Sequence, residues 1–449
     1  AEEFRALIEA AVSLRRERNN MRREAIHCPK VPRPVMGSHA VKAGDFVFLG
    51  GQIPSDYQNG LAPEVKRNSR GVSNPVVLSK IQSDYILNNA RAILESAGSS
   101  FKNGVRIDQF VTRPEAASPY LDTRKRFVPP SIRPASTHVA IEALAVPGAL
   151  VGLELIAVTD AGATRKRIID MGNVPKSPGG PFAGGPQAVV AGDFIFLTGQ
   201  IASDFKTGIA PEARKDPGFW YGSAIRLQTE YVLKRLQMVL EEAESSLDHV
   251  VKADVWLMDM EDVHEFDEVW KEYFPKNPPA RSLLPVSRIA DAQCLIEINL
   301  IAVRDGGKAK KKSVMARGVP APAGHQPHAV RAGDFLFLSG VFATDDGREI
   351  APEARIHPDM PWFGSAGRRQ TEHILSQMEK ICRAGGSRLA DVVWSQNFYA
   401  DFSEFDASLE VWERAFPKAP PAALVCGVRP PQWVRGCTIQ MDAVAAASR

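Results

Sequence analysis

The residues of this chain that could carry out acyl transfer are a serine, a histidine and a glutamate in its first third. Ser136 and His138 are two positions apart in a predicted strand, so their side chains share one face of it. Glu154 falls on the strand expected beside it. Such a Ser/His/Glu set can activate a hydroxyl nucleophile. No nucleophile elbow surrounds Ser136, however, which favours the alternative of a polar group without nucleophilic chemistry.

A metal site built from histidines is a second candidate. Four histidines lie in the last third of the chain, at His325, His328, His357 and His373. Their spacing alone is weak evidence, and histidines in loops are usually solvated. We therefore predict no metal site and no cofactor.

An internal repeat organises the elements that must position these residues. One motif begins AVKAGDF, AVVAGDF and AVRAGDF, at Ala40, Ala188 and Ala329. An Ala-Pro-Glu block recurs in the same register, at residues 62–64, 210–212 and 351–353. Two blocks at the same offsets rule out coincidence, so the chain contains three copies of one unit.

Each copy has the same predicted order of elements. A hairpin with an Ala-Gly-Asp turn leads into a strand, such as residues 194–197. A helix follows, with apolar residues on one face at Val232, Leu236, Val239 and Leu240. Residues 251–257 alternate as in a half-buried strand, and a helix over residues 263–274 and a terminal strand over 294–303 close the copy. This order predicts an α+β unit with a mixed, mostly antiparallel sheet and two helices on one face.

The boundaries between copies are marked by loss of the apolar pattern and by glycine with charged residues. We predict an N-terminal helical extension over residues 1–27 and three units over residues 28–165, 166–312 and 313–449. An amphipathic presequence is the alternative for the extension, although two acidic residues open it. The basic run over residues 308–312 is predicted to be a solvated linker.

The composition bounds the class of protein. A hydrophobic content of 44% and a charged content of 24% are ordinary for soluble globular proteins. No apolar run approaches the roughly 18 residues of a membrane span, and a net charge of +3 is too small for a nucleic-acid footprint. The five cysteines form no CxxC pair, and an odd number does not suggest a disulfide framework. We therefore predict a soluble cytoplasmic protein without nucleic-acid or membrane partners.

The second copy resembles a known family. Its runs FIFLTGQIASD, KADVWLMDMEDVHEF, PPARS and EINLIAVR are similar, in order and spacing, to the signature of the Rid (reactive intermediate deaminase, YjgF-like) family. The resemblance covers almost all of residues 166–305 and extends to the other copies through the repeat. It implies a chorismate-mutase-like fold. Because family members assemble as homotrimers with a ligand cleft between subunits, it also implies an intramolecular pseudo-trimer, whose further oligomerisation is left open.

The resemblance implies an activity as well. Family deaminases hydrolyse imine or enamine products of pyridoxal-phosphate enzymes and release ammonia. Their signature arginine, which grips the substrate carboxylate through two parallel hydrogen bonds, corresponds to Arg281, whereas the other copies have Ser136 and Ala423 there. Only one of three equivalent clefts is then expected to keep the anion clamp. The alternative is that Arg281 forms a structural ion pair between units.

Other family positions transfer unevenly. The Ser/Thr of the strand motif corresponds to Thr198 and Ser339, which would contact the substrate, but copy one has Gly50. Thr198 could equally be a strand residue with a satisfied hydroxyl. The tyrosine expected before the first strand is replaced in every copy, by Gly37, Gly185 and Gln326.

The acidic residue that would polarise the attacking water corresponds to Glu154 and Asp442, whereas copy two has Asn299. Glu297 lies two residues earlier on the same strand face and is the candidate to take the place of that acid.

The leading hypothesis is therefore a hydrolase of a C–N bond, in an imine, enamine or amide, acting on a small anionic substrate between two units. Arg281 would fix the anion, Thr198 would bind the substrate, and Glu297 or a neighbouring unit's acid would orient water. The alternative is a ligand-binding or scaffold protein with degenerate sites, which the loss of the arginine from two copies favours. RNA cleavage, also ascribed to the family, is disfavoured by the weak net charge.

Overall fold

Each repeat folds into one sheet with two helices against it. The computed structural model describes residues 23–66, 74–172, 174, 185–218, 221–360 and 362–447. The elements of unit 1 are β1 (Arg23–Ile26), β2 (Ala40–Ala43), β3 (Phe46–Gln52), α2 (Pro75–Ser96), β4 (Gly104–Val111), α3 (Ala117–Arg124), β5 (Ala135–Ala140), β6 (Ala143–Leu144) and β7 (Val151–Val158). Those of unit 2 are β8 (Lys166–Ile169), β9 (Ala188–Ala191), β10 (Phe194–Leu197), β11 (Gln200–Ile201), α4 (Ala224–Glu242), β12 (Val250–Leu257), α5 (Val263–Tyr273), β13 (Ala280–Pro285) and β14 (Ile296–Val303). Those of unit 3 are β15 (Lys311–Val314), β16 (Ala329–Ala332), β17 (Phe335–Leu338), α6 (Ala366–Ala384), β18 (Val392–Tyr399), α7 (Phe405–Ala415), β19 (Ala422–Gly427) and β20 (Ile439–Ala446).

The three sheets share one topology. The strand orders are β1-β2-β3-β7-β4-β5, β8-β9-β10-β14-β12-β13 and β15-β16-β17-β20-β18-β19, and β6 of unit 1 pairs with β19 at the edge of the third sheet. In unit 2, β12 pairs antiparallel with β14 and parallel with β13, and the other units repeat this arrangement. The hairpin turn between the second and third strands of each copy (β2/β3, β9/β10 and β16/β17) requires a positive φ, which Gly44, Gly192 and Gly333 supply at 57°, 61° and 56°. The predicted α+β class, with mixed and mostly antiparallel sheets, is confirmed.

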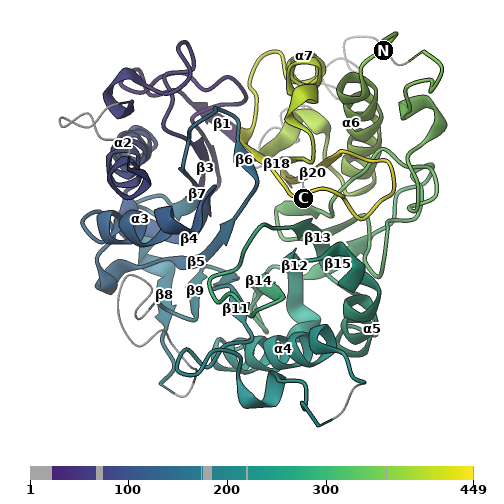
Figure 1. Ribbon diagram of the computed structural model, residues 1–449. Coiled ribbons are helices and arrows are strands. Elements are labelled where there is room, and N and C mark those ends of the chain that lie inside the picture. Colours follow the sequence, from purple (N-terminus) through teal and green to yellow (C-terminus); the bar gives the residue numbers. More distant parts are fainter. Residues whose placement is uncertain are drawn as a thin grey trace, which may run out of the picture.

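The helices cover only one face of each sheet. The first helix of each unit begins at a polar cap, because the side chains of Asn74, Ser223 and Ser365 accept a backbone N–H from the first turn. Figure 1 shows the helices around the outside of the molecule and the sheets toward its centre. The face of each sheet without helices is therefore turned toward the other two units. None of the helices in the described residues is long and apolar enough to cross a membrane.

An aromatic cluster lies where the three uncovered faces meet. Phe46, Phe194 and Phe335 occupy the same position in their units, directly after the hairpin turn. Each pair of these rings has its centroids 5.7 Å apart in an edge-to-face arrangement. The rings continue into a buried cluster with strand residues from all three units. The three units thus close around a common pseudo-threefold axis, as a pseudo-trimer within one chain.

Buried polar pairs join the same faces. Each pair links two different units: Arg106 with Asp254 (2.5 Å), Lys252 with Asp442 (2.8 Å), and Gln396 with Glu154. The three pairs connect unit 1 to unit 2, unit 2 to unit 3, and unit 3 back to unit 1. Because an unpaired charge in such a place is costly, these pairs favour one relative placement of the three units.

Two segments at the unit boundaries differ from the sequence prediction. Residues 1–22 of the predicted helical extension lie outside the described residues, and Arg23–Ile26 form strand β1, paired with β2, instead of a helix. Lys311 and Lys312, expected in a solvated linker, belong to β15 and pair with β16. Burial lowers the pKa of Lys311 to about 8. In both places the open edge of a sheet offers backbone hydrogen bonds, which bind a strand whatever its side-chain pattern.

We expect Phe194→Ala to destabilise the whole chain, because it removes a ring that contacts both other units. A loss of about 3–5 kcal/mol is expected for such a core truncation. Chemical denaturation measures the loss, and Phe363→Ala is the control, since Phe363 is 75% exposed. A Phe194→Ala protein as stable as the control would show that the axis contributes little to stability.

Candidate active site

The strand register shows which residues of the three units are equivalent. After the Pro-Ala dipeptide, the equivalent residues are Ser136, Arg281 and Ala423, paired with Ile107, Ala253 and Ser395. On the last strand, Gly152, Glu297 and Gln440 are equivalent, paired with Phe110, Trp256 and Phe398. The register also makes Asn299 the equivalent of Glu154 and Asp442, as the sequence suggested.

Each Pro-Ala strand lies against the next unit, and these contacts define three interfaces. At the 1/2 interface, the Gly199 N–H donates to the Ser136 carbonyl (3.0 Å). At the 2/3 interface, the Gly340 N–H donates to the Arg281 carbonyl (3.0 Å). At the 3/1 interface, the Ser38 N–H donates to the Pro421 carbonyl (2.9 Å). Each residue predicted to act in catalysis or substrate binding lies at or beside one of these three interfaces.

Arg281 lies at the 2/3 interface and is completely buried. Its Nη2 forms an ion pair with Asp267 on α5 (2.8 Å), and its Nε donates to Oε1 of Gln326 in unit 3 (3.1 Å). Gly324 closes the loop over it: a Cβ there would lie 2.5 Å from Nη2 of Arg281, and the φ of +69° also favours glycine.

Three aromatic rings complete the enclosure of this guanidinium. Its central carbon lies 5.2 Å from the ring of Phe266, 5.1 Å from Trp270 and 5.8 Å from Trp433. Burial alone would raise the pKa of Asp267, but the charge and hydrogen bonds of Arg281 outweigh it and lower that pKa. The geometry therefore supports the ion-pair alternative for Arg281, although the pair lies within unit 2, and Gln326 and Trp433 of unit 3 contact the guanidinium.

Glu297 lies at a different interface from Arg281, although both belong to unit 2. Its carboxyl group packs against Gly199, where any Cβ would collide with it, and accepts a hydrogen bond from the backbone of His138 in unit 1. Burial raises the pKa of Glu297 to about 8, and the nearby Asp108 adds to the rise. At neutral pH this carboxyl group is protonated, which suits a general acid. The expected cooperation of Arg281 and Glu297 in one site is wrong, because the two residues face different neighbours.

Ser136 and His138 line the same 1/2 interface on the helix side of β5. The His138 ring lies 6.1 Å from the ring of Tyr120 on α3. Burial, together with the charge of Arg124, lowers the pKa of His138 to about 3, so the imidazole is neutral. Arg124 is buried and donates to Gln109 (2.5 Å), and within the described residues no carboxylate forms an ion pair with it.

Tyr120 and Arg124 were missed by the sequence analysis. They lie four residues apart on α3, so they share one face of that helix. Their spacing is the only signal in the sequence that places them together. The tyrosine hydroxyl is buried and has no hydrogen-bond partner in the part of the chain that the structure describes. A buried donor without a partner is unusual in folded proteins.

Thr198 and Ser339 hold units together. The Thr198 hydroxyl accepts the Ser136 N–H (3.2 Å) and donates to the Pro186 carbonyl (2.6 Å). Ser339 repeats both bonds, accepting from Arg281 N–H and donating to the Pro327 carbonyl. Both hydroxyls are therefore engaged by backbone groups, which supports the structural reading of Thr198.

The acids predicted to orient water lie in the central polar pairs. Asp442 is bound to Lys252 and Ser282 on the 2/3 side, and Glu154 is bound to Gln396 on the 3/1 side. Burial and the nearby Asp108 raise the pKa of Glu154 well above its ordinary value. Glu154 points into the central layer between the units, whereas Ser136 and His138 point to the helix side of the sheet. The three side chains therefore do not form a triad. Asn299, at the 1/2 interface, donates to Oγ1 of Thr137 (2.6 Å) in the same layer.

The 3/1 interface lacks equivalents of both Arg281 and Glu297. Ala423 packs against Gly37, where a Cβ would lie 2.8 Å from the alanine Cβ, and Gly50 has equally little room beside the Ser38 carbonyl. Gly152 stands where the acid would be. An open pocket does lie between units 1 and 3, with Arg33, Tyr57, Trp412 and Lys418 in its lining.

The four histidines considered as metal ligands do not come together. His325 contacts the Phe274 carbonyl (2.7 Å), and His328 lies between the Ala316 N–H (2.9 Å) and the Pro320 carbonyl (2.5 Å). His357 is exposed beside Asp359. Only His373 has two acidic side chains around it.

Comparison with known proteins gives matches for all three units. A family model described as Endoribonuclease L-PSP matches residues 36–159, 180–304 and 317–447. A RutC family protein of Pyrococcus horikoshii is 41% identical over 140 residues, which are 31% of this chain and 99% of that protein. The chloroplastic Reactive Intermediate Deaminase A of Arabidopsis thaliana is 30% identical over 142 residues, 32% of this chain and 68% of that protein. A chorismatase crystal structure covers 77% of this chain and 93% of its own, at 12% identity and a TM-score of 0.48.

If Arg281 is structural, its removal must destabilise the fold. Arg281→Met leaves the Asp267 carboxylate without its partner and should lower the free energy of unfolding by about 3–5 kcal/mol. Arg388→Ala, which breaks an exposed pair with Asp391, should cost about 0–1 kcal/mol. Denaturant titration of both variants is the measurement, and equal small losses would contradict the structural role.

The buried Glu297 also predicts a pH dependence of stability. Its folded pKa of about 8 lies above the ordinary 4.5, so the folded state binds the proton more tightly than the unfolded state. Its contribution is most favourable below about pH 4.5 and is lost as the pH rises through about 8, a loss of roughly 3–5 kcal/mol. Unfolding of Glu297→Gln, measured from pH 5 to 9, should lack this loss, whereas the exposed Glu241→Gln should keep it. Identical pH profiles for both variants would refute the assignment.

Proposed function

Since the chain belongs to the family described as Endoribonuclease L-PSP, of which it contains three fused units, we propose that it hydrolyses a C–N bond of a small anionic substrate at the 1/2 interface. The observation that supports this most is Glu297, a buried carboxyl group whose pKa is raised to about 8. It lies at the contact of two units, the place where the Rid resemblance puts ligands. An imine or enamine is the substrate class that the resemblance favours.

The residues around Glu297 support a division of roles. The protonated carboxyl group can donate a proton to the imine nitrogen, which makes the carbon electrophilic. The resulting carboxylate can then accept a proton from the water that attacks this carbon. The carboxyl group then protonates the nitrogen of the tetrahedral intermediate, and the C–N bond breaks to release ammonia. The hydroxyl proton returns to the carboxylate, which leaves the carbonyl product and restores the acid. No cofactor is needed for this sequence.

Arg124 is our candidate for holding the substrate anion. It is a buried guanidinium for which the described residues offer an amide but no carboxylate. Its charge acts on His138, whose backbone in turn donates to Glu297. Arg124 thus replaces Arg281, whose own charge is already neutralised by Asp267. Ser136 and His138 are then polar wall residues, since Glu154 is bound to Gln396 in the central layer.

A ligand-binding protein without catalysis is the second candidate. It is favoured by the 2/3 interface, where Arg281 is closed off and Gln440 stands at the position of Glu297, and by the 3/1 interface, where Ala423 and Gly152 stand at the positions of Arg281 and Glu297. On this reading the 1/2 interface binds a ligand without turning it over.

The test is release of ammonia from freshly generated imino acids. Glu297→Gln should lower kcat/KM by about 10²–10⁴, the range of general acid–base catalysis, and the wild-type rate should fall above about pH 8 as Glu297 ionises. Arg124→Met should raise KM, and Glu241→Gln should leave both constants unchanged. Wild-type turnover in Glu297→Gln would exclude the proposed acid. Tight binding without turnover by the wild-type chain would establish the second candidate.

A further inference from the structure

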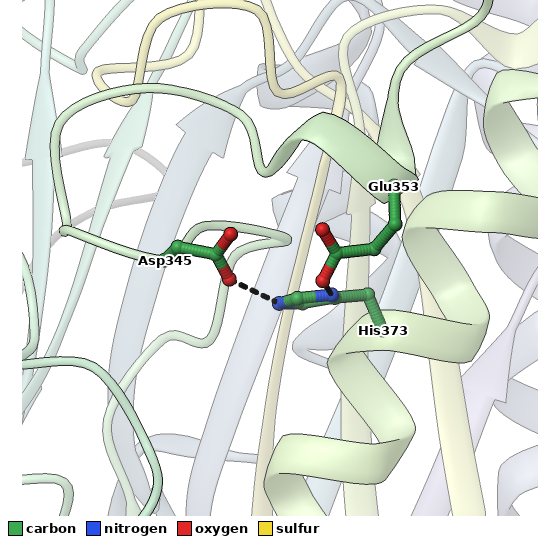
Figure 2. A group of neighbouring side chains, drawn as sticks. All are labelled: Asp345, Glu353 and His373. Atoms are coloured by element: carbon green, nitrogen blue, oxygen red, sulfur yellow. Dashed lines mark ion pairs between the residues drawn. The ribbon is translucent and has the colours of Figure 1, made fainter.

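A group of metal-ligating side chains lies in unit 3, apart from the residues discussed above. Figure 2 shows His373 between the carboxyl groups of Asp345 and Glu353, which point toward opposite edges of the imidazole ring. His373 is on α6, Glu353 is in a short 3-10 helix (Pro352–Ala354), and Asp345 is in the turn before it. The Nε2 atom of His373 lies 3.7 Å from Oδ1 of Asp345, and Nδ1 lies 3.0 Å from Oε1 of Glu353.

The two edges of the ring have different partners. Nδ1 faces only the Glu353 carboxylate at hydrogen-bond distance, so it carries the proton in the neutral ring. Nε2 then has a lone pair that faces Asp345 and the Thr344 carbonyl (3.3 Å) and accepts an N–H of the Gln377 amide (2.6 Å). The same amide nitrogen donates to the Thr344 carbonyl (2.8 Å), so this amide must turn to admit an ion. A histidine that binds a metal through one nitrogen usually donates its other N–H to a carboxylate, which fixes the ring. The arrangement around His373 has this form.

The equivalent places in the other units keep the two carboxylates but lack the histidine. Gln82, Gln228 and Gln370 each bond the chain just before the last strand, which aligns the three helices. Three residues later, His373 corresponds to Tyr85 and Tyr231. Four residues further on, Gln377 corresponds to Arg235 of unit 2, whose guanidinium donates to the Ser203 carbonyl (3.0 Å). Unit 3 therefore has an imidazole and a neutral amide where unit 2 has a phenol and a cation.

The turn also differs in a way that frees a carboxylate. In units 1 and 2, Asp56 and Asp204 follow the serine of the turn and accept backbone N–H groups two and three residues later. In unit 3 this capping is done by Asp346, which accepts from Arg348 and Glu349. Asp345 stands at the position of Asp204 but takes no part in the turn, so its carboxylate is available to a ligand.

From this geometry we propose that His373 and Asp345 bind a first-row divalent cation, best Zn²⁺, with the Thr344 carbonyl as a third ligand. A tetrahedral zinc ion with bonds of about 2.0–2.2 Å holds its ligand atoms about 3.3–3.6 Å apart. The Nε2 separations of 3.3 Å from Thr344 and 3.7 Å from Asp345 are close to this range. Glu353 accepts the Nδ1–H and orients the ring. Water, or the Gln377 amide turned so that its oxygen faces the ion, fills the fourth position.

Ligand chemistry selects among cations. An imidazole nitrogen with carboxylate and carbonyl oxygens suits zinc and its first-row neighbours, whereas magnesium prefers oxygen ligands in an octahedral shell. An ion here would tie the turn around Thr344 to α6. Thr344 and Gln377 also line a small cavity that reaches Ser339 and Gly340 at the 2/3 interface. The ion would therefore stabilise the unit 3 wall of that interface and would not take part in the proposed hydrolysis.

The experiment is titration of the metal-stripped full-length chain with Zn²⁺, followed by calorimetry and by thermal unfolding with and without zinc. We expect one zinc per chain, a rise in Tm on zinc addition, and no such rise with Mg²⁺. His373→Tyr, which installs the residue of unit 2, and Asp345→Asn should each weaken zinc binding at least tenfold. His264→Tyr is the matched control, because His264 is an exposed histidine beside Glu268 on α5.

The outcomes separate cleanly. The site is supported if zinc binding is unchanged in His264→Tyr and lost in both His373→Tyr and Asp345→Asn. The zinc-free Tm of these two variants must also stay near that of the wild type. Zinc binding that survives His373→Tyr, or that is lost equally in His264→Tyr, overturns the proposal. Failure of the wild-type chain to bind zinc overturns it as well, and the ammonia-release assay is independent of all three results.

Discussion

The face of each sheet that the helices leave bare carries an apolar cluster and a layer of buried polar pairs, and the other two units cover both. Phe46, Phe194 and Phe335 meet edge to face at the axis, and strand residues from every unit surround them. Once this contact forms, the edge of each Pro-Ala strand lies against the next unit. The positions of Ser136, Arg281 and Ala423 are consequences of that packing, because each lies at a contact that no single unit contains.

Fusion into one chain allows the three contacts to diverge. In a symmetric homotrimer a substitution appears at all three interfaces, but here each interface has its own residues. The 1/2 interface retains a buried acid and has lost the arginine. The 2/3 interface retains Arg281, enclosed by Asp267, Gln326 and aromatic rings, and has Gln440 at the position of Glu297. The 3/1 interface has Ala423 and Gly152 at these two positions, and glycine and alanine bring the two backbones close together there.

Burial explains why residues of similar type differ in role. Glu154, Asp442 and Glu297 all lie on the last strand of their unit. Glu154 and Asp442 belong to the central polar pairs, whereas Glu297 does not. Asp442 is held by Lys252, and Glu154 by Gln396. Their desolvation is balanced by partners across the axis, so they fix the placement of units. Glu297 accepts a backbone hydrogen bond from His138 of the neighbouring unit, and burial nevertheless raises its pKa to about 8.

The sequence by itself determined the number of units, the order of their helices and strands, and the equivalence of residues among them. These follow from local periodicity, turn residues and a repeat in constant register, all of which are readable without contacts. Only the tertiary structure decided that Arg281 and Glu297 of one unit face different neighbours, that Tyr120 and Arg124 stand beside His138, and that Asp345 is released from its turn. These arrangements depend on which face of a strand contacts which unit. Side-chain burial and charge pairing across units decide those contacts, and neither can be read from the local sequence pattern.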